Sequence, residues 1–317
     1  MSENHVVITG GLGFIGSHLV EYFLKNDFKI SIIDNLSTGF KENAELFKDN
    51  SKVEIHYKDC VQNWAEIIKD QSTQYVFHFA SPATPVSFDP LNLEIMDVNS
   101  IGLRNALDYA TKNGARLIFA STSEVYGNPL VSPQKESYFG NTNSFGERSC
   151  YDESKRFGEA LIYSYNKRHG TQHGLVRIFN TYGERMNPND GRVVVNFLKQ
   201  ALSGEPLTIY GDGQQTRSFC YVSDLVAGIV KYAQSNLTYP VNLGSQDERT
   251  ILSLVEQIKK LPEMSKLECV YKDLPGDDPK QRRPDISLAR KELAWEPQVG
   301  LDEGLKKMVL WLAEYTK

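Results

Sequence analysis

The chain has 317 residues, a formal net charge of −5 and a hydrophobic content of 40%, enough for a large core in one or two domains. The acidic balance excludes a general affinity for nucleic acid, and no apolar run approaches the roughly 18 residues of a membrane-crossing helix. Widely spaced cysteines without a CxxC pair exclude a disulfide framework and a zinc site, so no metal is expected. A strand pattern from His5 to Thr9 leaves no room for a signal peptide, and the cytoplasm is the expected location, with no membrane partner.

The first half of the chain alternates short β-rich runs with amphipathic helical stretches. The expected strands span residues 6–9, 29–33, 53–57, 75–79, 116–120 and 174–179, and the expected helices span 15–26, 64–69, 93–113 and 151–169. Such alternation is typical of βαβ units. It predicts the α/β class, with a Rossmann-type doubly wound parallel sheet that helices cover on both faces.

After about residue 180 the pattern changes to shorter elements separated by loops rich in Gly, Pro and Asn. Helices are expected near residues 193–203, 223–234, 251–261 and 302–315. We therefore expect residues 1–180 to form the sheet domain and residues 181–317 a smaller α/β domain that binds the substrate. Some chain is expected to cross between the two.

A glycine motif lies between the first expected strand and the first expected helix. Gly10, Gly13 and Gly16 form GxxGxxG, and Phe14 and Ile15 begin the helix. Glycines at these positions let the backbone turn tightly and let a pyrophosphate approach the free N–H groups of the helix N-terminus. Taken alone, such glycines are as often simple turn residues.

Side chains at the ends of the following strands extend the predicted cofactor site. Asp34 ends the second strand, 18 residues after Gly16, where a carboxylate can accept hydrogen bonds from the ribose hydroxyls and repel a 2′-phosphate. This favours NAD over NADP, although Asp34 could instead be a turn residue before Asn35. The further residues expected to bind the cofactor are Asn35, Asp59, Cys60, Ala80, Ser81 and Asn99.

A tyrosine and a lysine that can share one helix face form the candidate catalytic pair. Tyr151 and Lys155 are four residues apart, and Thr122, Ser123 and Glu124 follow an expected strand at the carboxyl edge of the sheet. Removing hydride from an alcohol requires a base, and Lys155 with the positive nicotinamide ring would pull the pKa of the phenol down from about 10. Lys155 could also hold the nicotinamide ribose, and a hydroxyl of Thr122 or Ser123 could orient the reacting oxygen. The alternative for the Tyr-x-x-x-Lys spacing is an exposed helix face.

With these motifs the chain resembles the extended short-chain dehydrogenases of the NAD-dependent epimerase/dehydratase family, and within it the UDP-glucuronate decarboxylases, or UDP-xylose synthases. The similar segments are 9–16 (TGGLGFIG), 121–127 (STSEVYG), 150–156 (CYDESKR), 177–183 (RIFNTYG), 190–197 (DGRVVVNF), 204–210 (GEPLTIY), 215–224 (QTRSFCYVSD) and 278–286 (DPKQRRPDI). They cover nearly the whole chain.

The resemblance implies oxidation of the sugar at carbon 4, loss of its carboxylate as carbon dioxide, and re-reduction to UDP-xylose, with the ketone rather than a metal as the electron sink. It implies that Glu124 and Arg282 serve the decarboxylation. The residues that it places near the nucleotide sugar are Asn180, Arg192, Val193, Val194, Tyr210, Arg217 and Arg282. On residue type alone, Arg282 could also belong to a solvated charged loop and Tyr210 to the core.

One position departs from the decarboxylase pattern. Asp97 stands where those enzymes usually carry a lysine, and an acid there should repel a carboxylated sugar. A nucleotide-sugar 4-dehydrogenase, a 4,6-dehydratase or a 4-epimerase acting on a neutral, UDP- or GDP-linked sugar therefore stays open. A non-catalytic nucleotide-binding protein is the alternative from another class, and the intact Tyr151, Lys155 and Ser/Thr set disfavours it. The family also implies a homodimer formed by the two long helices of the first half.

Overall fold

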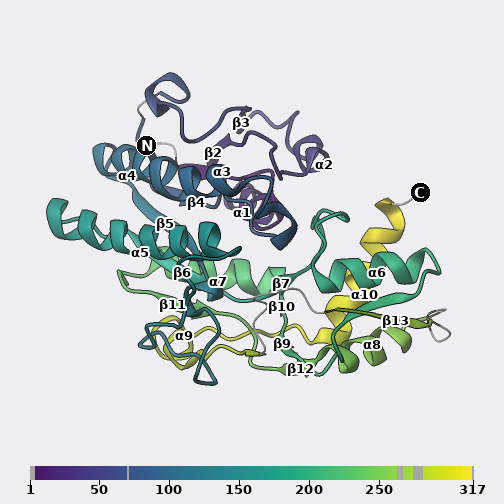
Figure 1. The fold of residues 1–317 in the computed structure, drawn as a ribbon. Coiled ribbons are helices and arrows are strands. Elements are labelled where there is room, and N and C mark those ends of the chain that lie inside the picture. Colours follow the sequence, from purple (N-terminus) through teal and green to yellow (C-terminus); the bar gives the residue numbers. More distant parts are fainter. Residues whose placement is uncertain (1–3, 70, 263, 265–266, 274–280, 316–317) are drawn as a thin grey trace.

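A seven-stranded sheet organises the molecule (Figure 1). Its strand order is β11-β6-β5-β4-β1-β2-β3, and every pairing is parallel. The strands are β1 (His5–Thr9), β2 (Lys29–Ile33), β3 (Val53–His56), β4 (Tyr75–His78), β5 (Arg116–Thr122), β6 (Gly174–Ile178) and β11 (Val241–Leu243). The structure, a computed structural model, describes the chain except for residues 1–3, 70, 263, 265–266, 274–280 and 316–317. The predicted doubly wound α/β fold is confirmed.

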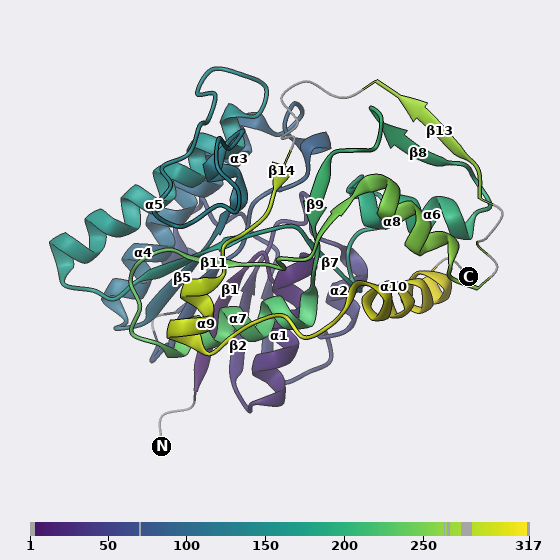
Figure 2. The ribbon, with the colours of Figure 1, turned by 90° about the horizontal axis from the view of Figure 1, so that it is seen from below.

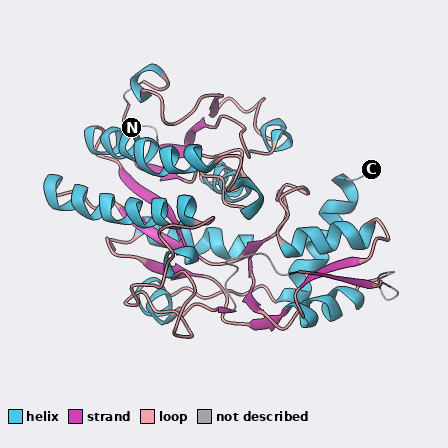
Figure 3. Ribbon diagram, viewed as in Figure 1, coloured by secondary structure: helices cyan, strands magenta, loops and turns pink. Residues whose placement is uncertain are grey.

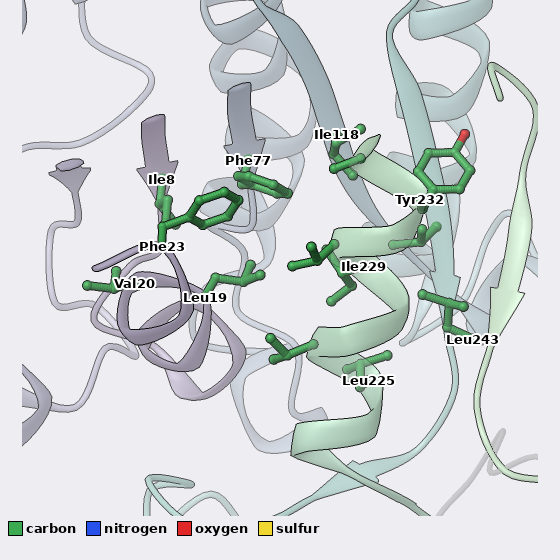
Figure 4. Close-up of a cluster of buried hydrophobic side chains, with 14 of the residues drawn as sticks. Ile8, Leu19, Val20, Phe23, Phe77, Ile118, Leu225, Ile229, Tyr232 and Leu243 are labelled. Atoms are coloured by element: carbon green, nitrogen blue, oxygen red, sulfur yellow. The ribbon is translucent and has the colours of Figure 1, made fainter. Parts of the chain in front are cut away.

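One face of the sheet packs against α1 (Phe14–Lys25) and α7 (Val222–Gln234). Successive strand residues point to opposite faces, so Ile8 of β1 joins this core whereas Val7 joins the other. Figure 4 shows Phe23 of α1 beside Phe77 of β4, with ring centroids 5.2 Å apart. The same cluster holds Ile229 of α7, so a helix from the second half of the chain completes the first half's core.

The other face is covered by α4 (Leu103–Lys112) and α5 (Ser149–His169), which lie side by side in Figures 1 and 2. Gly158 of α5 lies so close to the sheet that a Cβ would meet the Phe119 ring at 2.7 Å. Because this close contact draws α5 onto β5, the first turn of α5 is held over the carboxyl end of β5. That placement positions Tyr151 beside Thr122.

The C-terminal part forms its own core around α6 (Val193–Leu202), α8 (Ile251–Lys259) and α10 (Leu301–Tyr315). Figure 3 shows these helices and the nearby short strands grouped at one side of the main sheet. The strands are β7 (Thr181–Tyr182) with β10 (Cys220–Tyr221), β8 (Leu207–Tyr210) with β13 (Cys269–Lys272), and β9 (Thr216–Ser218) between β12 (Glu248–Thr250) and β14 (Gln281–Arg282). Two further short helices are α2 (Lys41–Glu45) and α9 (Ser287–Leu293). The division at residue 180 stays a prediction, and α7, β11 and α9 are the crossing elements.

Two predicted helices differ in the structure. The helix expected at 64–69 is only a 3-10 turn, Trp64–Glu66, which Asn63 caps. Trp64 is buried and its indole N–H donates to Cys60 O at 2.9 Å, so tertiary packing of the ring replaces helix propagation. The helix expected at 93–113 is divided into α3 (Asn92–Asp97), a π-helical stretch Val98–Gly102, and α4. The π-helical stretch contains the buried Asn99.

Candidate active site

A cavity of about 360 Å³ opens at the carboxyl ends of the central strands. Its wall begins at the glycine turn after β1, passes the residues that follow β2, β3 and β4, and ends at the residues after β5 and β6. Parallel sheets place strand ends, with their polar loop residues, at one edge, and this is where open α/β folds bind ligands. Among the described residues, no group of three His, Cys, Asp or Glu side chains could hold a metal ion.

The glycine turn fits a dinucleotide because its backbone is packed too closely for side chains. Gly10 has a φ of 69°, and a Cβ on it would lie 2.7 Å from Ala80 N. A Cβ on Gly16 would lie 2.0 Å from Gly10 O. Gly13 caps α1 without a side-chain hydrogen bond, and Phe14 and Ile15 line the cavity with it. The helix N-terminus therefore faces the space where a pyrophosphate would bind.

Gly16→Ala is expected to lower the affinity for NAD at least about tenfold, because the added methyl forces the turn apart. Calorimetric titration with NAD measures this. Gly300→Ala is the matched control, since a Cβ there meets nothing within 4 Å. Unchanged NAD affinity in the Gly16 variant would contradict the assignment of this turn.

Asp34, which follows β2, lines the cavity. It is buried, and its two carboxylate oxygens accept hydrogen bonds from Leu12 N (3.0 Å) and Leu36 N (2.9 Å). Burial raises the pKa of Asp34. Asn35 Nδ2 donates to Asp59 Oδ2 at 2.9 Å, which joins the ends of β2 and β3. The fixed carboxylates fit the hydroxyl groups of an adenosine ribose and disfavour a 2′-phosphate.

Tyr151 lies in the first turn of α5, buried under the ring of Phe88 at a centroid distance of 5.1 Å. A side-chain hydrogen bond joins it to Thr122, the last residue of β5. Lys155 follows one turn later, with its ammonium 5.6 Å from the Tyr151 ring centroid and a 2.9 Å hydrogen bond to Ala120 O. The structure therefore brings the predicted pair together and singles out Thr122 as the hydroxyl that contacts the phenol.

In the protein alone, burial governs the pKa values of Tyr151 and Lys155. Burial raises the pKa of Tyr151 to about 12, opposed by the Thr122 hydrogen bond and, among nearby charges, by Arg192. Burial also lowers the pKa of Lys155 to about 7, so at neutral pH the lysine carries only part of its charge. The oxidised nicotinamide would supply the remaining positive charge next to the phenol.

Glu124 accepts hydrogen bonds from two arginines in different parts of the chain. Its Oε2 accepts from Arg148 Nη2 at 2.7 Å and from Arg282 Nη2 at 2.8 Å. Burial would raise the pKa of Glu124, but Arg282 and Arg148 hold it below its ordinary value. Arg282 is 1% exposed and also donates to Ser123 O (3.1 Å) and Gly127 O (2.8 Å). The solvated-loop alternative for Arg282 is therefore wrong.

The short three-stranded sheet positions Arg282 next to another arginine, Arg217. Arg282 of β14 pairs in register with Arg217 of β9, so both belong to one edge of the C-terminal part. Both line the cavity, together with Glu124 and Arg148. This edge adds guanidinium groups to the cavity wall, and such groups suit a carboxylate or a diphosphate.

The comparisons with known proteins agree with this geometry. Residues 6–244 match the family model described as NAD dependent epimerase/dehydratase family. The chain belongs to this family. It is 45% identical to UDP-glucuronic acid decarboxylase 1 of Danio rerio, over 98% of this chain and 73% of that protein. It is also 45% identical to UDP-glucuronic acid decarboxylase 3 of Arabidopsis thaliana, over 96% of this chain and 87% of that protein.

Solved structures of the epimerase/dehydratase family superpose on nearly the whole chain. UDP-glucose 4-epimerase of Thermotoga maritima, solved with UDP-glucose, has a TM-score of 0.91 at 28% identity and covers 99% of this chain and 100% of its own. UDP-glucuronic acid 4-epimerase of Bacillus cereus, solved with UDP-glucuronic acid and NAD, has a TM-score of 0.88 at 26% identity and covers 98% and 99%.

Within this epimerase/dehydratase fold, most of the predicted site residues line the one cavity. They are Gly10, Gly13, Phe14, Ile15, Gly16, Asp34, Asn35, Asp59, Cys60, Ala80, Ser81, Thr122, Ser123, Glu124, Tyr151, Lys155, Asn180, Arg192, Arg217 and Arg282. Burial raises the pKa of the Cys60 thiol, so this residue contributes an apolar wall. Their individual roles stay proposals.

Four predicted residues lie elsewhere. Asn99 is buried behind the wall and donates to Ser81 Oγ and Ser154 Oγ, both at 3.1 Å, so it supports Ser81 from the side away from the cavity. The side chains of Val193 and Val194 pack into the C-terminal core at the start of α6, so only their backbone could contact a base. Tyr210 is 41% exposed and borders a separate open hollow with Tyr271, so it is neither core nor cavity wall.

The sequence interpretation missed several cavity residues. Arg148 on Glu124, Phe88 on Tyr151, and Asp190, whose carboxylate pairs with Arg192, all line the cavity. Arg148 lies three residues before Tyr151, outside the segments that carry the family resemblance. Phe88 and Asp190 lie in loops, and their place in the cavity wall depends on tertiary packing.

Proposed function

We propose that this protein is a UDP-glucuronate decarboxylase that uses NAD and forms UDP-xylose. The observation that carries the proposal is the Glu124–Arg148–Arg282 cluster, which faces the same cavity as Tyr151 and Thr122. The arginines beside Glu124 suit the carboxylate of an acidic sugar, a group that a neutral sugar lacks. The 45% identity with UDP-glucuronic acid decarboxylases over nearly the whole chain supports the same choice.

The proposed reaction begins with the alcohol at carbon 4 of the sugar. Tyr151, paired with Thr122, would take the hydroxyl proton, and bound NAD would supply the chemistry that accepts the hydride and later returns it. The resulting ketone makes the sugar carboxylate a β-keto acid. Its carbon–carbon bond breaks, carbon dioxide leaves, and the electron pair enters the enolate, whose oxygen Tyr151 and Thr122 stabilise by hydrogen bonds. Arg282 would orient the departing carboxylate, and Glu124 would fix Arg282.

Product analysis tests this proposal directly. Purified protein is incubated with NAD and UDP-glucuronate, and in parallel with UDP-glucose and GDP-mannose. The products are identified by mass spectrometry and by proton NMR, which distinguishes 4-epimers of equal mass. Release of carbon dioxide with formation of UDP-xylose is the expected result. A 4-keto sugar accompanied by persistent NADH absorbance, or an unchanged sugar mass with inverted configuration, would overturn it.

A neutral nucleotide sugar is the second candidate substrate, because Asp97 and Glu94 of α3 also line the cavity. Carboxylates at the sugar end would favour hydroxyl groups over a second carboxylate. The substrate panel separates the two, since a 4-epimerase or 4-dehydrogenase acts on UDP-glucose without loss of carbon.

We also propose a homodimer in the cytoplasm; among the described residues, no helix is long and apolar enough to cross a membrane. Apolar side chains are exposed along neighbouring helices that cover one sheet face: Leu93, Met96 and Ile101 on α3 and the π-helical stretch, and Phe157 and Tyr163 on α5. A contiguous apolar patch of this kind is typical of a subunit interface.

Phe157→Glu is expected to convert the dimer to monomer, because it places a charge within the patch that the dimer would bury. Gel filtration with light scattering at micromolar concentration measures the mass. Leu310→Glu places the same charge at an exposed position of α10, outside the patch. This variant should have the same particle mass as the wild-type protein. A wild-type protein that elutes only as monomer contradicts the proposal.

A further inference from the structure

Gln134 is a fully buried glutamine outside the cavity. It lies in the loop between the 3-10 turn Ser123–Tyr126 and α5, and it is 0% exposed. Its side-chain oxygen Oε1 accepts a hydrogen bond from Arg283 N at 2.9 Å, and its Nε2 donates to Val131 O at 2.7 Å. Because a buried amide is costly without such partners, these two hydrogen bonds hold the side chain in one orientation.

The backbone of Gln134 pairs with the segment that follows Arg282. Gln134 N donates to Arg283 O at 2.8 Å, and Asp285 N donates to Gln134 O at 2.8 Å. Together with the side-chain bond to Arg283 N, these hydrogen bonds fix the chain on the carboxyl side of Arg282. The loop therefore restrains the point from which the Arg282 side chain reaches Glu124.

Asn242 of β11 joins this pairing to the main sheet. Its Nδ2 donates to Gln134 O at 3.0 Å and to Asp285 O at 3.1 Å. Glu124 follows β5, which belongs to the same sheet. The residues after Arg282 are thus held in a fixed relation to the sheet that carries Glu124.

Arg282 is therefore supported from two directions. On one side β14 pairs in register with β9 of the C-terminal part, and on the other the Gln134 loop holds the chain against the main sheet. Arg282 Nη2 donates to Glu124 Oε2 at 2.8 Å, and hydrogen bonds weaken steeply when the donor moves or tilts. Loss of the second support would shift the guanidinium relative to Glu124 and to the substrate.

We propose that Gln134 is a positioning residue for the decarboxylation step. Its side-chain hydrogen bond to Arg283 N holds Arg282 in place beside Glu124. The inference rests on the proposed decarboxylase function and adds a residue that acts on the reaction from outside the cavity. Oxidation at carbon 4, which depends on Tyr151, does not need this support.

Gln134→Met removes the acceptor for Arg283 N and keeps most of the bulk of the side chain. Decarboxylation of UDP-glucuronate should slow between about tenfold and about 10²-fold, because displacing a catalytic group by about 1 Å lowers rates on that scale. Oxidation should keep its wild-type rate, so NADH accumulates before carbon dioxide appears. Rapid-mixing absorbance, combined with detection of carbon dioxide, measures the two steps.

Gln200→Met is the matched control. Gln200 Oε1 likewise accepts from a backbone N–H, that of Thr208, at 3.1 Å. Gln200 lies in α6 and Thr208 in β8, and β8 pairs with β13 rather than with β14. A general loss of stability would therefore appear in both variants, and slower decarboxylation only in Gln134→Met.

A double-mutant cycle tests whether Gln134 acts through Arg282. In the Arg282→Lys background, Gln134→Met should slow decarboxylation less than about twofold further, because the guanidinium that it positions is already absent. Equal slowing in both backgrounds would overturn the inference, as would a wild-type ratio of the two steps in Gln134→Met. Should Gln134→Met not fold, Gln134→Asn, whose amide is one methylene shorter, takes its place in the same cycle.

A crystal structure of the Gln134 variant separates this inference from the proposed function. Displacement of the Arg282 guanidinium from Glu124 supports the positioning role, and an unmoved guanidinium contradicts it, whichever sugar the enzyme converts. Failure of the proposed function is a different result, namely no carbon dioxide and no UDP-xylose from the wild-type protein.

Discussion

Replacing Tyr151 by phenylalanine is expected to lower turnover of UDP-glucuronate about 10³-fold while the protein stays folded and binds NAD. The substitution removes the Tyr151 hydroxyl, which forms a hydrogen bond with Thr122. In the proposed reaction, this hydroxyl takes the proton from the alcohol at carbon 4. It keeps the ring that stacks on Phe88 at 5.1 Å, so the cavity wall is preserved. The lost hydrogen bond costs about 1 kcal/mol of stability, which is small against the free energy of unfolding of a domain.

Steady-state release of carbon dioxide measures the effect of Tyr151→Phe, and calorimetry confirms NAD binding. Tyr165→Phe is the matched control on the same helix. Its hydroxyl donates to Asp108 at 2.7 Å, on the helix face that packs against α4, so its loss should leave turnover unchanged. Full activity of the Tyr151 variant would remove the basis of the oxidation step.

Arg282→Lys is expected to slow decarboxylation by about two to three orders of magnitude and to leave the preceding oxidation measurable. Lysine keeps the positive charge, but its single nitrogen cannot replace both Nη1, which donates to Ser123 O and Gly127 O, and Nη2, which donates to Glu124 Oε2. The buried carbonyl groups left without a donor should cost about 1–3 kcal/mol each, seen as a lower melting temperature.

Rapid-mixing absorbance distinguishes the two steps in Arg282→Lys. NADH should accumulate before carbon dioxide appears, because the ketone forms at its usual rate but loses its carboxylate slowly. Arg283→Lys, at the next position with a side chain 39% exposed, should behave as wild type. If the Arg282 variant released carbon dioxide at the wild-type rate, the arginine would have no part in that step.

The cofactor half of the site was predictable because its signals are local. GxxGxxG spans a single strand–turn–helix unit, and the steric limits that require Gly10 and Gly16 arise within that unit and the adjoining strand end. Tyr151 and Lys155 lie one turn apart on a helix that the hydrophobic pattern predicts. Strand ends of a parallel sheet also meet at one edge, which predicts where Asp34 and Thr122 lie.

The Glu124–Arg148–Arg282 cluster was not predictable from the spacing of residues in the sequence. Glu124 meets Arg282 across 158 residues, through a strand of two residues, Gln281–Arg282, that pairs with β9. So short a strand has no periodicity of its own. The resemblance named Glu124 and Arg282, but Arg148 as their third member came only from the structure.

The predicted helix at 64–69 was wrong because of tertiary packing. A turn replaces it, and Trp64 is buried in the sheet core instead of extending a helix. Burial likewise raises the pKa of Tyr151 to about 12 in the protein alone. Both effects depend on segments that lie far away in the sequence.

Local order along this chain thus specified the elements, the dinucleotide turn and the Tyr–Lys pair, since each depends on neighbours within a few turns or at strand ends. The shifted pKa values of Tyr151 and Lys155, and the hydrogen bonds from Arg148 and Arg282 to Glu124, depend on the tertiary structure. Electrostatic energies depend on burial and on separations of a few ångströms, and both are set by contacts between residues far apart along the chain.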